Sequence, residues 1–156
     1  MFGDLATFTF VHVLLSLVAL AAGFVVVGGL MGGGWFRGWI GVFLVTTVLT
    51  NVTGFGFPST QILPSHVVAV LSLVVLAVAI VAYYGQHLRG GWRRVFVITS
   101  VAALYFNVFV LIVQVLQKFP ALADVAPQGS PAFGVTQLGA LVLLVAMGRA
   151  AVRGTR

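Results

Sequence analysis

Two histidines, His12 and His66, are the side chains of this chain best suited to chemistry in an apolar setting. His12 lies about one helical turn inside a long apolar run, and His66 lies at the start of another. Imidazole is the usual protein ligand of b-type haem and a common ligand of copper and zinc. Two histidines from two helices of one bundle can supply both axial ligands of a haem iron. The sequence therefore predicts a metal or haem b site at His12 and His66, with two alternatives: a hydrogen-bonded, quinone-like ligand and a purely structural role.

Four amide side chains in the apolar runs are further candidates for binding a cofactor: Asn51, Asn107, Gln114 and Gln137. An uncharged polar group in hydrocarbon is costly unless it is hydrogen-bonded, so these groups should face one another or a ligand. Ser100, Asn107 and Gln114 recur every seven residues, which places them on one helix face that should point into the bundle. The alternative is a contact role, because Ser, Thr and Asn commonly hold membrane helices together, at about 0.6 kcal/mol per contact.

The rest of the composition removes several kinds of chemistry. The chain has no cysteine, which excludes disulfides, thiolate nucleophiles, covalently attached haem c and cysteine-held iron–sulfur clusters. Asp4 and Asp124 are its only acids, so a carboxylate pair of the glycosidase or di-iron type is not expected inside the membrane. Ser16 shares a helix face with His12, as a serine nucleophile and its base would, but the chain has no acid besides Asp4 and Asp124 to orient the pair. Zinc is also disfavoured, because no third His or Cys lies near His12 and His66.

The elements that position these side chains follow from the composition. The chain has 156 residues, of which 61% are hydrophobic and 6% are charged, and its mean hydropathy is +1.18. Soluble domains carry about 25% charged residues, so the expected solvent is the lipid bilayer. Apolar runs long enough to cross it occur at five places: Phe8–Leu30, Phe36–Thr53, Ser65–Tyr84, Arg94–Gln117 and Pro131–Ala151. The sequence therefore predicts an all-α fold: a polytopic membrane helical bundle of about five transmembrane helices, forming a single domain over residues 1–156.

Basic residues set the expected orientation of the bundle, because short cytoplasmic loops are enriched in Lys and Arg. Five spans place the first-to-second connection, the third-to-fourth connection and the C-terminus on one side of the membrane. That side holds seven of the eight basic residues: Arg37, Arg89, Arg93, Arg94, Arg149, Arg153 and Arg156. We therefore expect a multi-pass protein of the cell membrane, of the bacterial inner-membrane type, with its N-terminus outside and its C-terminus in the cytoplasm.

These observations favour a small membrane protein that holds a redox cofactor or lipophilic ligand in a polar cluster at its outer side. Membrane lipids are the expected partners, and the net charge of +6 is a topology signal that does not indicate nucleic acid. One alternative is a non-catalytic accessory subunit of a larger membrane complex or a self-associating module, for which Gly28 and Gly32 provide a small-xxx-small pair. A second alternative is a channel or carrier for a small neutral solute, which the nearly pure Val, Leu and Ala of the inner halves disfavours.

Overall fold

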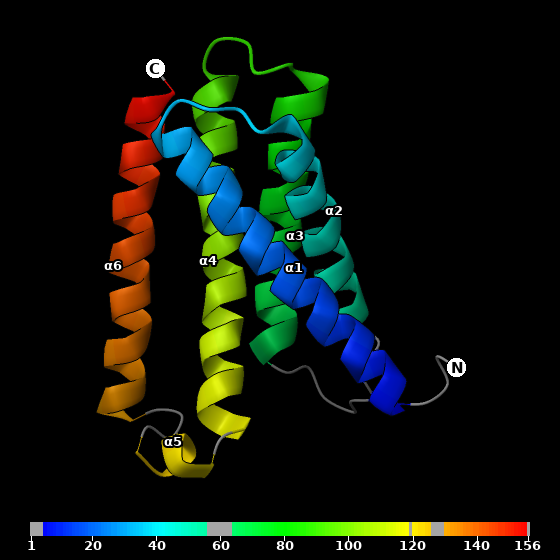
Figure 1. Ribbon diagram of the computed structural model, residues 1–156, viewed down its shortest axis with the longest axis vertical. Coiled ribbons are helices and arrows are strands. Elements are labelled where there is room, and N and C mark those ends of the chain that lie inside the picture. The colour runs from blue at the N-terminus through cyan, green and yellow to red at the C-terminus, as the bar shows by residue number, and fades with distance from the viewer. Residues whose placement is uncertain (1–4, 56–63, 119, 126–129, 156) are drawn as a thin grey trace.

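The structure, a computed structural model, describes residues 5–55, 64–118, 120–125 and 130–155, and these residues form helices and short turns without strands (Figure 1). The helices are α1 (Leu5–Met31), α2 (Arg37–Gly54), α3 (Pro64–Ile80), α4 (Trp92–Lys118), α5 (Pro120–Val125) and α6 (Pro131–Gly154). A five-residue π-helix, η1 (Val81–Gly85), continues α3. The predicted all-α fold is confirmed, and when η1 is counted with α3, the ends of the long helices differ from the predicted runs by at most three residues.

Four of the described helical segments are long and apolar enough to cross a membrane: Thr7–Met31, His66–Gly85, Trp92–Val113 and Pro131–Gly154. The remaining predicted span is α2. It has 18 residues, or about 27 Å at 1.5 Å per residue, against a hydrocarbon core of about 30 Å. Arg37 opens α2, and Thr and Asn residues are frequent in its second half, so α2 lacks an apolar stretch as long as those of the other four segments. The described residues thus form a multi-pass membrane bundle with four such spans and the shorter helix α2 beside them.

The chain runs up and down between two ends of the bundle (Figure 1). Residues 32–36, residues 86–91 and the end of α6 lie at one end, which we name the basic end because the described arginines are there. The start of α1, the end of α2, the start of α3 and the short helix α5 lie at the other, which we name the polar end. The connections are therefore grouped as the basic residues predict, and the orientation of the two ends in a membrane stays a prediction.

The interior is built around α4, which contacts α1, α3 and α6. Phe96 and Leu104 of α4 are fully buried, as is Phe43 of α2. α1 crosses the bundle diagonally (Figure 1), and Gly23 is its point of close approach: an added Cβ atom would lie 2.7 Å from Cδ1 of Leu104 and 2.9 Å from Cε1 of Phe43. Gly28, by contrast, has no atom within 4 Å of an added Cβ, so it makes no helix contact in the described chain. Tight packing of this kind, rather than the hydrophobic effect, holds helices together in lipid.

Candidate functional site

His12 of α1 is held against the end of α2. Its Nδ1 lies 2.7 Å from Oγ1 of Thr53, and an added Cβ atom on Gly54 would lie 3.7 Å from its Cε1. Thr53 Oγ1 also lies 2.8 Å from the carbonyl oxygen of Leu49, to which it can donate its single hydrogen. Both contacts are satisfied at once when Thr53 donates to Leu49 and His12 donates through Nδ1 to Thr53. That arrangement places the acceptor lone pair of the neutral imidazole on Nε2.

His66 of α3 contacts Phe55, the residue that follows α2. The two rings stack, with ring centroids 5.4 Å apart and an interplanar angle of 19°. They line an open groove of about 390 Å³ that is completed by Val67, Val70 and Leu71. These three aliphatic side chains are each about half exposed, so the groove opens sideways on the apolar surface that faces lipid. Among the described residues that line the groove, His66 is the one polar side chain.

Both histidines therefore lie at the end of α2, but they have different neighbours there. His12 contacts Thr53 and Gly54, whereas His66 contacts Phe55 and lines the groove, of which His12 is not part. In the described part of the chain, no group of three or more His, Cys, Asp or Glu side chains is placed to hold a metal ion. A site that uses His12 and His66 together, for a metal or for haem, stays a prediction.

Two of the predicted amide residues, Asn51 and Asn107, are buried and bonded to neighbouring helices. Asn51 Nδ2 donates to Ser72 Oγ in α3 and to the carbonyl oxygen of Thr47, in both cases at 3.0 Å. Asn107 Nδ2 in α4 donates to Thr47 Oγ1 at 3.4 Å. These four buried residues, which we name the amide cluster, tie α2 to α3 and α4. The amide nitrogens of Asn51 and Asn107 thus donate to other helices or to their own, as the contact role predicts, and the predicted binding role of these two residues stays a prediction.

The other two predicted amide residues are Gln137 and Gln114, and the structure describes only the first of these side chains. Gln137 of α6 is buried against α4, where its Nε2 donates to the carbonyl oxygen of Phe109 at 3.3 Å. Its Oε1, like the Oγ of Ser100, is buried without a hydrogen-bond partner among the residues described. Gln114 lies in α4, but its side chain falls outside the described part of the structure. Ser100 and Asn107 are both buried, as their spacing predicts for a stripe that faces the bundle.

Sequence reasoning missed the partners of these side chains. Ser72, which accepts the hydrogen bond of Asn51, is the single hydroxyl residue in the otherwise aliphatic stretch from Val67 to Ala82, and that isolation is the available signal. Phe55, which stacks on His66, carries no comparable signal, because aromatic residues are common in the loops that lie at membrane interfaces.

Comparison with known proteins adds no relative from which a function can be transferred. No protein-family model matches the chain, no curated protein matches its sequence, and no solved structure matches it. The function has to be inferred from the groove at His66, the hydrogen bond of His12 and the amide cluster.

Proposed function

We propose that this membrane protein binds a lipophilic ligand with a hydrogen-bonding head group, of the quinone class, in the groove at His66. One observation carries the proposal: among the described residues, the groove combines an exposed apolar lining on α3 with one imidazole, that of His66. Small-molecule sites are lined mostly by apolar and aromatic side chains with a few polar groups that orient the ligand, and they measure about 300–1,000 Å³. The groove, at about 390 Å³, fits this description.

The chemistry of the lining residues suits a quinone ring. A neutral imidazole has one N–H donor and one acceptor nitrogen, so His66 can donate to a quinone carbonyl or accept from a quinol hydroxyl. Phe55 adds an aromatic surface against which a second ring can pack. Val70 and Leu71 are placed for contact with the ring edge and the start of a hydrocarbon tail, which continues into the surrounding lipid. A ligand dissolved in the bilayer reaches such a groove without crossing water.

A b-type haem with His12 and His66 as axial ligands is the second candidate. The hydrogen bond from His12 to Thr53 favours it, because a histidine that binds a metal commonly donates its other ring N–H to an oxygen atom, which orients the ring. A bound haem would supply one-electron redox chemistry. We rank it second, because the groove is lined by His66 without His12, and a ligand there would contact one histidine only.

The quinone proposal is tested by the binding of decyl-ubiquinone to the whole protein in neutral detergent micelles. We expect saturable binding that His66→Ala weakens about tenfold or more, since the substitution removes both a hydrogen bond and a stacked ring. Val74→Ala is the matched control, because Val74 is an exposed aliphatic residue of the same helix outside the groove. It should change the affinity by less than about twofold. Binding that is not saturable, or that His66→Ala leaves unchanged, would refute the proposal.

The haem candidate is tested by absorption spectra of the oxidised and reduced protein, purified after expression with ample haem. A Soret band that is lost in both His12→Ala and His66→Ala would support axial ligation by the pair and would displace the quinone proposal. In that case Thr53→Val, which removes the hydroxyl that orients His12, should lower the haem content of the purified protein. An absent band, or one that survives both histidine substitutions, excludes this candidate.

A further inference from the structure

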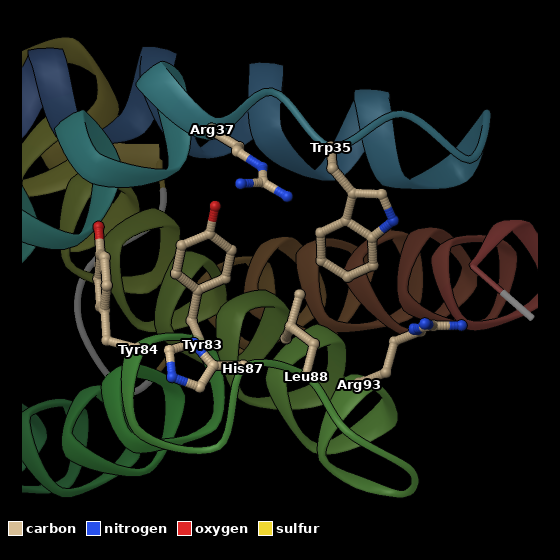
Figure 2. Close-up of a pocket in the computed structure, with 7 residues that line it drawn as sticks. All are labelled: Trp35, Arg37, Tyr83, Tyr84, His87, Leu88 and Arg93. Atoms are coloured by element: carbon tan, nitrogen blue, oxygen red, sulfur yellow. The ribbon is translucent and has the colours of Figure 1, made fainter.

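A second site lies at the basic end of the bundle, at the opposite end from His66. A cavity of about 550 Å³ lies between the residues at the start of α2, the end of η1 and the start of α4 (Figure 2). Its lining contains two cations and four aromatic or imidazole rings: Arg37, Arg93, Trp35, Tyr83, Tyr84 and His87. In the sequence these residues are markers of topology and of the membrane interface. In the fold they form one cavity that carries positive charge.

The aromatic walls of this cavity are positioned by the core. Phe96 of α4 is fully buried, and its ring centroid lies 5.8 Å from that of Trp35 and 5.1 Å from that of Tyr83. Tyr83 in turn meets Tyr84 edge to face, with ring centroids 4.8 Å apart. The rings therefore form a preorganised wall rather than a set of separate surface side chains.

The backbone beside the cavity departs from a regular helix. η1 is a π-helix, a widened turn that occurs frequently at functional sites. His87 and Leu88 follow it with φ angles of 51° and 60°, which non-glycine residues rarely adopt. The Leu88 N–H donates to the carbonyl oxygen of Ala82 at 3.0 Å and stabilises this conformation. Tyr83 and Tyr84, which are neighbours within η1, both line the cavity.

The cations of the cavity have no described acidic partner in the protein. The acids of the chain are Asp4, which precedes α1 in the sequence, and Asp124 in α5 at the polar end. Figure 2 shows the guanidinium of Arg37 directed towards the hydroxyl of Tyr83, whereas that of Arg93 points away from Tyr83. A guanidinium is a planar fork of donors that matches the oxygens of a phosphate, and a tyrosine hydroxyl adds a further donor.

We propose that this cavity binds a phosphate group, held by Arg37 and the hydroxyl of Tyr83, with the aromatic wall against the part of the ligand that carries the phosphate. Two sources offer this group at the end of a membrane bundle: the head group of an anionic phospholipid and a free phosphate compound in the adjoining solution. The charge of Arg93 adds a longer-range attraction for a lipid head group or a free phosphate compound, which salt screens beyond about 10 Å. The groove at His66 takes no part in this site, so the two proposals can fail independently.

The source is decided by the binding of three probes to the whole protein in neutral detergent: inorganic phosphate, short-chain phosphatidylglycerol and phosphatidylcholine of the same chain length. Tryptophan fluorescence reports binding, because Trp35 lines the cavity. Phosphatidylglycerol that binds about tenfold or more tightly than phosphatidylcholine, with no binding of inorganic phosphate, identifies a lipid site. Binding of inorganic phosphate identifies a site open to soluble compounds. Equal binding of the two lipids with no binding of phosphate overturns the proposal.

The roles of Arg37 and Tyr83 in binding are tested by matched variants. Arg37→Gln should weaken binding about tenfold or more, because it removes a charge-assisted hydrogen bond. Arg153→Gln is the control: it removes an exposed cation from the same end but outside the cavity, and it should change the affinity by less than about twofold. Tyr83→Phe keeps the ring beside Phe96 and removes the hydroxyl, for a loss of about threefold, and it replaces Arg37→Gln if that variant does not fold. Equal losses of affinity in Arg37→Gln and Arg153→Gln would contradict the proposed site. If Arg37→Gln does not fold, an unchanged affinity in Tyr83→Phe would contradict it.

Discussion

The two ends of the bundle accommodate polar side chains in opposite ways. Towards the polar end the polar groups that enter the apolar interior are uncharged, and most of them bond to other groups of the protein, as Asn51 does with Ser72 and His12 with Thr53. At the basic end, Arg37 and Arg93 line a cavity without a described carboxylate beside them. The difference shows that uncharged groups enter the apolar region by pairing across helices, whereas unpaired charges stay where water and head groups reach them.

This contrast also separates the two proposed sites. The described lining of the groove at His66 is apolar with one imidazole and suits a ligand that is dissolved in hydrocarbon. The cavity at the basic end has two guanidinium groups and suits an anion. Between them, the amide cluster pairs its members with one another, so that Asn51 and Asn107 connect α2 to α3 and α4.

The prediction with the largest expected effect concerns which end of the bundle faces the cytoplasm. The chain has no cysteine, so single Cys substitutions can be labelled without background. With the basic end in the cytoplasm, Asp124→Cys should react with a membrane-impermeant maleimide in intact cells, and Gly90→Cys should react only after the cells are opened. Both positions are exposed. The opposite labelling pattern would place the basic end outside and the groove at His66 on the cytoplasmic side.

The second largest effect is expected on the stability of the protein, from helix packing between the two ends. Gly23→Ala places a Cβ atom 2.7 Å from Leu104 and 2.9 Å from Phe43, and overpacking of this kind costs about 1–3 kcal/mol. We expect that loss in the free energy of unfolding, measured by titration with SDS in mixed micelles. Gly28→Ala is the matched control on the same helix, with no atom within 4 Å of the added Cβ, and it should stay within about 0.5 kcal/mol of the wild type. Equal values for the two variants would mean that α1 does not pack closely at Gly23.

The amide cluster gives a smaller effect. Hydrogen bonds between membrane helices contribute about 0.6 kcal/mol on average and up to about 1.7, so Asn51→Ala should lower the free energy of unfolding by about 1 kcal/mol. Thr46→Ala should cost less than about 0.5 kcal/mol, because the hydroxyl of Thr46 bonds to carbonyl oxygens of its own helix. If the stability of both variants is unchanged, the cluster does not hold α2 to α3, and a ligand-binding role for Asn51 becomes the better explanation.

The smallest effect belongs to Gln137, whose amide is only partly satisfied. Its Oε1 lacks a described partner, and its bond to the carbonyl oxygen of Phe109 is 3.3 Å long. Replacing an unsatisfied buried polar group by an apolar one of similar shape can be neutral or stabilising. Gln137→Leu should therefore leave the free energy of unfolding within about 0.5 kcal/mol or raise it. A loss above about 1 kcal/mol would indicate that a ligand or water occupies the Oε1, and it would support the predicted binding role of Gln137.

The helices of this protein are predictable from sequence because lipid leaves the backbone few choices. Without water, every N–H and C=O group must bond within the chain, so an apolar run of about 20 residues forms a helix. Prolines and glycines between the runs mark where each helix ends. With η1 counted as the end of α3, the long helices therefore begin and end within three residues of the predicted positions.

The candidate sites are less predictable, because they depend on how the helices are turned against each other. Spacing alone shows that Ser100 and Asn107 share a buried face. It does not show that Asn51 meets Ser72, since that contact depends on the rotation and height of two helices. The cavity at the basic end depends on η1 and on the packing of Phe96, and the sequence Val81–Gly85 carries no signal that separates a π-helix from an α-helix.

Two separate ligand sites in one small bundle can be tested in a single experiment. The chain has three histidines, of which His66 lines the groove and His87 lines the cavity at the basic end. NMR spectra of the protein with ¹⁵N-labelled histidine in micelles would report on both sites at once. Decyl-ubiquinone should shift the signals of His66 and leave those of His87 unchanged, and short-chain phosphatidylglycerol should do the reverse. A quinone that shifts His87, or that leaves His66 unchanged, would contradict this division of the molecule.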